Sequence, residues 1–261
     1  MTRRPDEADR LCCRAVVAYD GTDYAGFQRQ PNGTPTVQGA LEEAIKQVTG
    51  QEITVKGAGR TDSGVHASGQ VIGFEVPWRH PTHDLWRAIN AHLPATVVLQ
   101  SLEQVQRGFH PRYDAKSREY EYTMYISPVR QPLLNKYAWH VPVNGPLDLK
   151  AMQRAASLLI GEHDFATFGQ PTQGEVTIRE VIRSEFVIIL GSQPNVQVIR
   201  YTIAANAFLF RMVRRIVGAL CRVGSCDLTV EAFEAAFRAA DGTWPCPSAP
   251  AHGLCLVEVK Y

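Results

Sequence analysis

The residues best suited to chemistry lie in a glycine-rich segment, Gly57-Ala-Gly-Arg-Thr-Asp-Ser-Gly-Val-His66. In this segment Asp62 stands between a guanidinium, Arg60, and an imidazole, His66. A carboxylate held in a cleft can act as a nucleophile or as a base, and glycines let the backbone turn sharply and approach a ligand closely. The same pattern is also compatible with a polar turn in which Asp62 bonds to its own backbone. The choice between the two depends on the rest of the chain.

The composition is that of a soluble globular protein. The chain has 261 residues, of which 45% are hydrophobic and 20% charged, so it suits one large domain or two small ones. No apolar run approaches the ~20 residues needed to span a bilayer. Residues 1–10 are polar and lack the apolar core of a signal peptide. We therefore expect a flexible leader on a cytoplasmic protein.

No metal or cofactor is expected. The six cysteines form no Cys-x-x-Cys pair, so free buried thiols are the expected state. His66 is the only histidine beside Asp62, which makes a metal site improbable. The sequence also lacks the Gly-x-x-x-x-Gly-Lys and Gly-x-Gly-x-x-Gly patterns that bind nucleotide phosphates.

Two successive sets of elements are predicted from hydrophobic periodicity and turn residues. The first set is a strand at 11–19, a helix opened by Thr34-Pro35 and stopped by Gly50, strands at 53–58 and 70–76, a helix at 84–91 and a strand at 96–102. The second set is a strand at 118–126, a helix at 148–160, strands at 179–190 and 196–204 around the turn Gly191-Ser-Gln-Pro194, helices at 208–223 and 229–240, and a strand at 254–261. Pro35 is expected at the first helical position.

This order predicts an α+β fold of two tandem ferredoxin-like (split βαβ) units. After the leader, residues 11–105 form the half that carries the Asp62 segment, and residues 106–261 form the half that carries a basic helix. The antiparallel sheets of the two halves are expected to join around a central catalytic cleft.

Positive charge is concentrated locally although the net charge is only +1. Between Phe186 and Cys226 there is no Asp or Glu, and there are five arginines: Arg200, Arg211, Arg214, Arg215 and Arg222. On the predicted helix, Arg211, Arg215 and Arg222 share one face and Arg214 lies at its border. A basic face is often only a solubility device, but the lack of any compensating acid favours polyanion binding.

A second basic cluster is interleaved with aromatic residues. It comprises Arg107, Phe109, His110, Arg112, Tyr113, Lys116, Arg118 and Tyr120. Such a mixture suits an unstacked base that lies on a ring beside its phosphates. Alternatively Phe109 and Tyr113 pack in the core, and we expect this of at least one of them.

Taken in order, several motifs closely resemble the TruA family of tRNA pseudouridine synthases. They are Tyr19-Asp-Gly-Thr-Asp-Tyr-Ala-Gly-Phe-Gln-Arg-Gln30, Gly59-Arg-Thr-Asp-Ser-Gly-Val-His-Ala67, Asn90-Ala-His-Leu-Pro94, Phe109-His-Pro-Arg112, Arg118-Glu-Tyr120, Asn206-Ala-Phe-Leu-Phe-Arg-Met-Val-Arg214 and Ala249-Pro-Ala-His-Gly-Leu-Cys-Leu256. Phe27 stands where the family commonly has Trp. The resemblance spans the whole chain.

The resemblance implies an isomerase (an intramolecular transferase) that converts uridine to pseudouridine at positions 38, 39 and 40 of the tRNA anticodon stem-loop, without a cofactor. It also implies a homodimer with one tRNA held across both subunits. Asp62 would be the catalytic aspartate, Arg214 its partner, and Tyr120 the residue that stacks on the target uracil. Arg60 would help to push the base out of its stack. The remaining residues expected to bind substrate are His66, Arg29, Gln30, Arg112, Arg211 and Arg215.

Two other functions remain open at this point. A non-catalytic RNA-binding module would use the same Arg211–Arg222 basic helix, but the presence of Asp62, Tyr120 and Arg214 together argues against it. A retaining glycosidase needs two carboxylates about 5 Å apart, and no second acid accompanies Asp62 in its segment.

Overall fold

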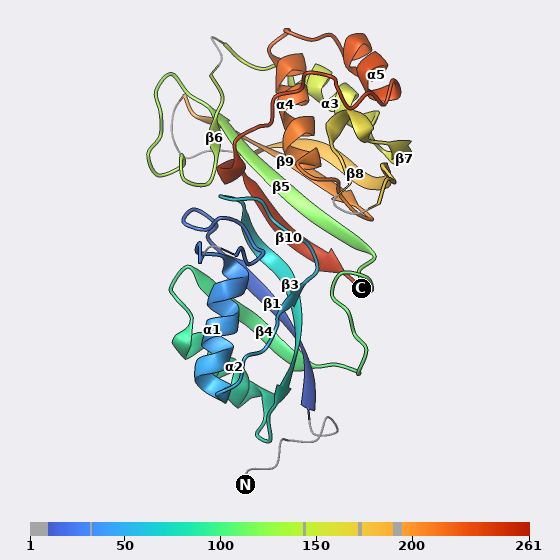
Figure 1. Cartoon of the computed structure of the whole chain (residues 1–261). Helices are drawn as coiled ribbons and strands as arrows, with labels where there is room; N and C mark the ends of the chain where they lie inside the picture. The colour runs from blue at the N-terminus through green and yellow to red at the C-terminus, as the bar shows by residue number, and fades with distance from the viewer. Residues whose placement is uncertain (1–9, 32, 143–144, 172–173, 190–194) are drawn as a thin grey trace. The chain divides into compact units, whose positions relative to one another are not determined.

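The computed structural model describes residues 10–31, 33–142, 145–171, 174–189 and 195–261 (Figure 1). The chain forms two compact units: unit 1 extends to Lys116 and includes Leu256–Tyr261, and unit 2 is Ser117–Cys255. The predicted leader and the predicted turn at 191–194 lie outside the described residues, except that Arg10 is the first residue of a strand.

Up to Lys116, the described residues of unit 1 form four strands and two helices in the predicted order. They are β1 (Arg10–Tyr19), α1 (Val37–Thr49), β2 (Lys56–Gly57), β3 (His66–Pro77), α2 (Thr82–His92) and β4 (Val97–Gln104). The central strand β1 is antiparallel to both β3 and β4, and β2 pairs with β3. Strand β10 (Leu254–Lys260) follows β3 in the sheet. Both helices lie on one side of these strands (Figure 1).

Local sequence determines where helix α1 begins and ends. The Thr36 hydroxyl caps the helix by accepting from the Gly39 N–H (3.2 Å), and Gly50 ends it in a left-handed conformation (φ 70°). Val37, Leu41 and Ile45 are fully buried. Pro35 therefore precedes the cap, and its predicted place at the first helical position is wrong, because the Thr36 side chain takes the cap and Val37 begins the helix.

Unit 2 is built on four antiparallel strands in the order β5-β9-β8-β7 within its described residues. Its elements are β5 (Ser117–Ile126), β6 (Trp139–His140), α3 (Leu149–Ser157), β7 (Gly161–Asp164), β8 (Ile178–Ile189), β9 (Gln197–Ala205), α4 (Met212–Gly224) and α5 (Val230–Arg238). The short strand β6 is parallel to β5. Helix α4 packs on β5, where the Cys221 Sγ lies 3.7 Å from the Met124 Sδ.

The helix predicted at 208–223 starts later than expected. Phe210 forms a bridge with Gln170, and Arg211 has a left-handed backbone (φ 60°), so the helix begins only at Met212. Likewise, the helix predicted at 148–160 ends at Ser157, and Asp148 is its cap. The strand predicted at 53–58 is reduced to Lys56–Gly57, the two residues that pair with β3.

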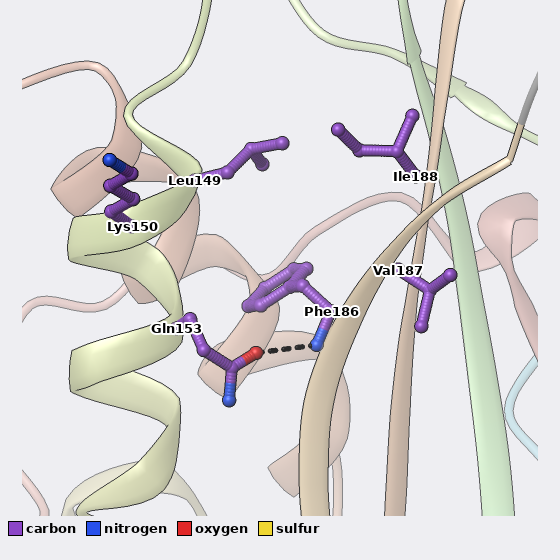
Figure 2. A pocket seen from close by; sticks show the side chains of 6 residues that line it. All are labelled: Leu149, Lys150, Gln153, Phe186, Val187 and Ile188. Atoms are coloured by element: carbon purple, nitrogen blue, oxygen red, sulfur yellow. Dashed lines mark hydrogen bonds between the residues drawn. The ribbon is translucent and has the colours of Figure 1, made fainter.

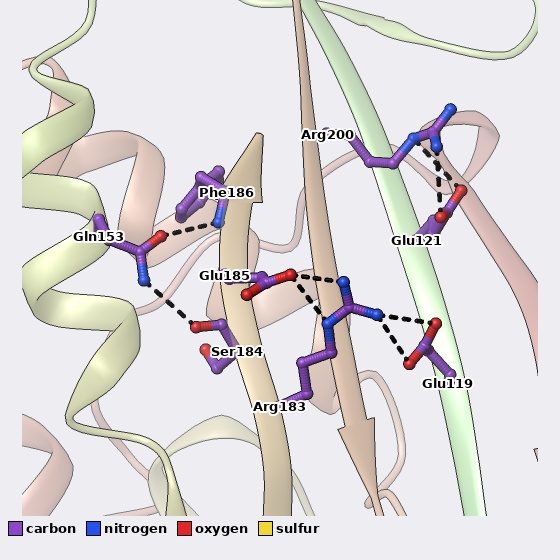
Figure 3. A network of polar contacts seen from close by, with 8 residues as sticks. All are labelled: Glu119, Glu121, Gln153, Arg183, Ser184, Glu185, Phe186 and Arg200. Atoms are coloured by element: carbon purple, nitrogen blue, oxygen red, sulfur yellow. Dashed lines mark hydrogen bonds and ion pairs between the residues drawn. The ribbon is translucent and has the colours of Figure 1, made fainter. Parts of the chain in front are cut away.

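Ion pairs cover part of the sheet of unit 2 (Figure 3). Arg183 bridges Glu119 and Glu185, and Arg200 lies beside Glu121 with Nε 3.3 Å from a carboxylate oxygen. Glu119 and Glu121 come from β5, far from Arg200 in the sequence. Arg200 is therefore compensated in space, although the stretch around it contains no acid.

Candidate active site

The segment 58–65 connects β2 to β3 and carries Asp62 at a half-buried position. Its neighbour Thr61 is buried and Arg60 is exposed. Gly64 has a positive φ of 75°, and the Val65 N–H donates to the Asp62 carbonyl (3.1 Å), which closes a tight turn. At the other end of the segment the Gln70 amide donates to the Gly59 carbonyl (2.9 Å). The carboxylate of Asp62 is thus carried on a rigid loop.

A second loop, residues 20–31, is hydrogen-bonded to the Asp62 loop. The hydroxyls of Tyr19 and Thr61 share a hydrogen bond of 2.8 Å, and the Phe27 N–H donates to the Thr61 carbonyl (3.1 Å). The Gly64 N–H donates to the Tyr24 carbonyl (3.3 Å), and the Ser63 hydroxyl donates to the same oxygen (3.2 Å). The two motifs that the sequence separates by some thirty positions therefore form one structure in unit 1.

Glycines make this close approach of two backbones possible. A Cβ at Gly21 would lie 2.0 Å from the Val65 carbonyl oxygen, and one at Gly26 would lie 2.7 Å from the Thr61 oxygen. Gly26 also has φ +102°, which side-chain-bearing residues rarely adopt. A Cβ at Gly57 would meet the Phe27 ring at 2.5 Å, so Phe27 packs directly on the loop that carries Asp62.

His66 is bound inside this structure. It is 6% exposed, its Nδ1 accepts the Gly21 N–H (3.1 Å), and the same atom lies 3.3 Å from an Asp20 carboxylate oxygen. Because Nδ1 accepts a backbone hydrogen bond, the imidazole joins the two loops. This geometry supports bracing, rather than proton transfer, as the role of His66.

We expect Gly21→Ala to disrupt the braced loops, because the new methyl group cannot avoid the Val65 carbonyl. The loss of stability should be at least about 2 kcal/mol, which corresponds to a fall in Tm of roughly 5 °C or more for a chain of this size. Differential scanning calorimetry measures it. Gly242→Ala is the matched control, since its Cβ would make only an ordinary 3.5 Å contact. Equal Tm values for the two variants would contradict the close packing of the loops.

Arg29 and Gln30 make contacts within unit 1. The Arg29 guanidinium pairs with Glu42 (3.0 Å), and its backbone N–H donates to Gln38 (2.8 Å). The Gln30 amide donates to the Ala25 carbonyl (2.9 Å). Both side chains therefore help to shape the loop, while Arg29 remains 64% exposed.

Unit 2 holds the other residues expected to contact the base. Tyr120 on β5 is 8% exposed and packs edge-on against Phe208, with ring centroids 5.2 Å apart. Arg118, two residues earlier, is also buried and donates to the Asn206 carbonyl (2.8 Å). The strand predicted at 118–126 is confirmed as β5, in which Tyr120, Tyr122 and Met124 are all buried.

Arg214 lies in the first turn of α4 and is fixed by the segment that precedes β10. Its Nε donates to the Ala249 carbonyl (2.8 Å), and the Ala249 N–H donates back to the Arg214 carbonyl (2.9 Å). Gly218 allows this segment to lie against the helix, because a Cβ there would be 2.0 Å from the Pro247 oxygen. Ala249 opens the last of the motifs quoted above, and it contacts Arg214 through its backbone.

The predicted basic face of α4 differs from expectation. Arg211 precedes the helix and is exposed, so it is not part of the helical stripe. Arg215 and Arg222 are half-buried. The Cys246 thiol donates a hydrogen bond to the Arg215 backbone carbonyl (3.0 Å). Burial raises the pKa of Cys246 to about 11, against the opposing effect of the two positive charges. The positive charges of both arginines therefore lie close enough to the Cys246 thiol to lower its pKa.

The second basic cluster is divided between the units. Residues 107–116 belong to unit 1, whereas Arg118 and Tyr120 belong to unit 2. Phe109 is half-buried against Tyr261, with ring centroids 5.2 Å apart, whereas Tyr113 is 71% exposed. The expectation that at least one of these two rings packs in the core is therefore wrong, because Phe109 lies against Tyr261 at the surface and stays only half-buried.

The residues expected to act on substrate therefore fall into two groups. Unit 1 carries Arg29, Gln30, Arg60, Asp62, His66 and Arg112, and unit 2 carries Tyr120, Arg211, Arg214 and Arg215. A hollow of ≈ 430 Å³ between α3 and β8, lined by Leu149, Lys150, Gln153, Phe186, Val187 and Ile188, contains none of them (Figure 2). It has no acidic side chain, and Gln153 spans it by accepting the Phe186 N–H (2.8 Å).

Within the part of the chain that the structure describes, no three His, Cys, Asp or Glu side chains are grouped so that they could hold a metal ion. The six cysteines are free, and three of them (Cys12, Cys13 and Cys221) are buried. No helix among the described residues is long and apolar enough to cross a membrane.

Comparison with known proteins gives a consistent result. A family model described as tRNA pseudouridine synthase matches residues 15–114 and 155–261. Proteins named tRNA pseudouridine synthase A are 39% identical over 258 residues in Neisseria gonorrhoeae (98% of this chain, 94% of the relative) and 41% identical over 255 residues in Moorella thermoacetica (96% and 99%). A third, from Brevibacillus brevis, is 41% identical over 252 residues (95% and 98%). The matched residues include Asp62 and Arg214 but not Tyr120.

Proposed function

This chain belongs to the tRNA pseudouridine synthase family, and from that premise we propose that it acts on uridines 38, 39 and 40 of the tRNA anticodon stem-loop with Asp62 as the catalytic carboxylate. It is an isomerase of uridine in tRNA. The observation that carries the assignment of Asp62 is the braced loop of unit 1, in which two family motifs hold this side chain half-buried. The three positions rest on the motif resemblance.

The reaction needs no atoms from outside the nucleoside except protons. The bond from the sugar C1′ to N1 breaks, the uracil turns, and C1′ bonds to C5. The C5 proton leaves and N1 takes up one proton, so no electrons are gained or lost. We propose that Asp62 contacts the nucleoside directly, by attack on C1′, by attack on C6, or by removing a sugar proton. Each route needs the carboxylate to be ionised.

An uncharged environment would oppose that ionisation. A uridine turned out of its stack would cover Asp62 and complete its burial, which disfavours the charged form unless a cation is near. We propose that the Arg214 guanidinium is that cation. Its support is the bond to the Ala249 carbonyl, which fixes where the guanidinium points.

Tyr120 and Arg60 complete the proposed site. Tyr120 would stack on the target uracil, or also remove the C5 proton, and its ring is held in place by Phe208. Arg60 is exposed beside Asp62, where it could enter the RNA and displace the base.

The direct test uses tRNA that carries tritium at C5 of its uridines. The purified protein should release tritium, because the C5 proton is lost when C5 bonds to the sugar. A tRNA with cytidine at positions 38, 39 and 40 is the control and should release none. Equal release from both would contradict the proposed positions, and no release from either would contradict the assignment of activity.

Family membership favours the enzyme over the two other functions. A non-catalytic RNA-binding module would bind the same tRNA but release no tritium. A retaining glycosidase would release free base from the sugar, which the same incubation would reveal by chromatography.

We also propose a homodimer that works in the cytoplasm. Light scattering should give a mass close to twice the 29.0 kDa of one chain, and a monomer mass at working concentrations would contradict it. Finally, we infer that both units are of the split βαβ type. The pairing of β1 with β3 and β4, and of β2 with β3, supports this for unit 1.

A further inference from the structure

Tyr113 is a large aromatic side chain that remains mostly exposed. Its side chain is 71% exposed, in the turn between β4 and β5. The His110 ring lies 4.3 Å from it at an interplanar angle of 31°, and the Arg112 guanidinium carbon is 5.9 Å from its centroid. These two contacts lie within the turn itself and leave most of the ring open to solvent.

The turn that carries Tyr113 is held rigidly by its own hydrogen bonds. The His110 Nδ1 accepts the N–H groups of Arg112 (3.2 Å) and Tyr113 (3.4 Å). Asp114 accepts the His110 N–H (2.9 Å) on its carboxylate and donates its own N–H to the His110 carbonyl (3.1 Å). The exposed ring is thus ordered before any ligand arrives, which lowers the entropic cost of binding.

The base of the turn is anchored to the rest of unit 1. Pro111 lies on Gly73 of β3, where a Cβ would come within 3.0 Å of the proline ring. The Tyr261 hydroxyl donates to the Pro111 carbonyl (2.8 Å), and the Phe109 ring packs on Tyr261. Tyr113 therefore lies in a turn that is fixed to the sheet of unit 1.

Charge around the ring suits a polyanion. Among residues 107–116, Arg107, Arg112 and Lys116 are basic and Asp114 is the one acid. An exposed ring beside cations is the combination on which single-stranded nucleic acids stack, since every base has a π-face and each nucleotide carries a phosphate.

We propose that Tyr113 is a stacking platform for an unpaired base of the RNA substrate, with Arg112 binding a flanking phosphate; this rests on the proposed function. The platform serves a different nucleotide from the one at Asp62. Gly73 follows His66 by seven positions on β3, which is roughly 23 Å at ~3.3 Å per residue. The platform thus contacts the RNA at a nucleotide that is distant from the reacting uridine.

The test compares three substitutions at one position. Tyr113→Ala should raise the Kd for tRNA about tenfold, while the single-turnover rate at saturating tRNA stays unchanged. Tyr113→Phe should bind like the wild type because it keeps the ring, and Tyr113→Leu should bind like Tyr113→Ala although it is apolar. Filter binding and rapid-quench kinetics give the two quantities, and unchanged Tm values show that the variants fold.

Salt dependence separates stacking from charge. Arg112→Gln should reduce the slope of log K against log salt by about one, whereas Tyr113→Ala should leave the slope unchanged. A Kd for Tyr113→Ala within twofold of the wild type, or a Tyr113→Leu variant that binds normally, overturns the platform.

The two proposals can fail separately. If the wild type releases tritium and Tyr113→Ala binds normally, only the platform is wrong. If the wild type binds tRNA through Tyr113 but releases no tritium, the platform stands and the proposed function is wrong.

Discussion

Asp62→Asn should bind tRNA with near-normal affinity and form pseudouridine at least about 10³-fold more slowly than the wild type. The amide has the size of the carboxylate but can neither attack carbon nor take up a proton. The loop should keep its shape, because the Val65 N–H bonds to the backbone carbonyl of Asp62 and not to its side chain. Tritium release measures the rate, and filter binding measures the Kd.

Ser63→Ala is the matched control in the same loop. It removes only the hydroxyl bond to the Tyr24 carbonyl (3.2 Å), so its rate should stay within a few-fold of the wild type, in keeping with a net loss of about 1 kcal/mol. If Asp62→Asn formed product at a normal rate, another residue would have to supply the carboxylate. If it lost tRNA binding as well, Asp62 would be structural.

Arg214→Ala should lower kcat about 10²–10³-fold with a smaller change in KM. Removing one partner of a buried ion pair costs about 3–5 kcal/mol. Asp62 is only half-buried in the structure without RNA, so the full loss is felt only once a uridine covers it. The loss of an interaction that is stronger in the transition state than in the bound ground state lowers kcat. Single-turnover kinetics at saturating tRNA measures it.

Arg211→Gln separates this effect from simple phosphate binding. Arg211 is exposed at the start of α4, and its loss should raise the Kd and reduce the salt slope while kcat stays unchanged. In the Asp62→Asn background, Arg214→Ala should weaken tRNA binding less than it does alone if the two side chains are partners. An Arg214→Ala variant with normal kcat and weaker binding would show that Arg214 contacts phosphate instead.

Local signals were sufficient for much of the fold. Val37, Leu41 and Ile45 recur at helical spacing, and Gly50 ends α1 as its sequence predicts. In β5, Tyr120, Tyr122 and Met124 alternate with polar residues in the sequence, and all three are buried. These features depend on residues within a few positions of one another, which is the range over which periodicity and capping act.

Features that depend on distant contacts could not be predicted. Phe210 is kept out of α4 by its bridge to Gln170, forty positions earlier. Arg200 looked uncompensated because its partner, Glu121, lies on another strand. In the site, the sequence marked Asp62 and Arg214, but the bonds that hold them come from Tyr24, Thr61 and the Ala249 backbone. Such contacts have no local pattern.

Unit 1, which carries Asp62, is completed by residues from far along the chain. Leu256–Tyr261 belong to unit 1 together with the residues up to Lys116, although Ser117–Cys255 separate them in the sequence. Gly69 of β3 approaches the Val257 carbonyl so closely that no Cβ would fit, and Tyr261 bonds to Pro111. Unit 1 cannot complete this sheet until Leu256–Tyr261 reach it, because a closure of such high contact order waits for its last strand. A change in Leu256–Tyr261 would therefore reach the Asp62 loop through β3, from residues far along the chain.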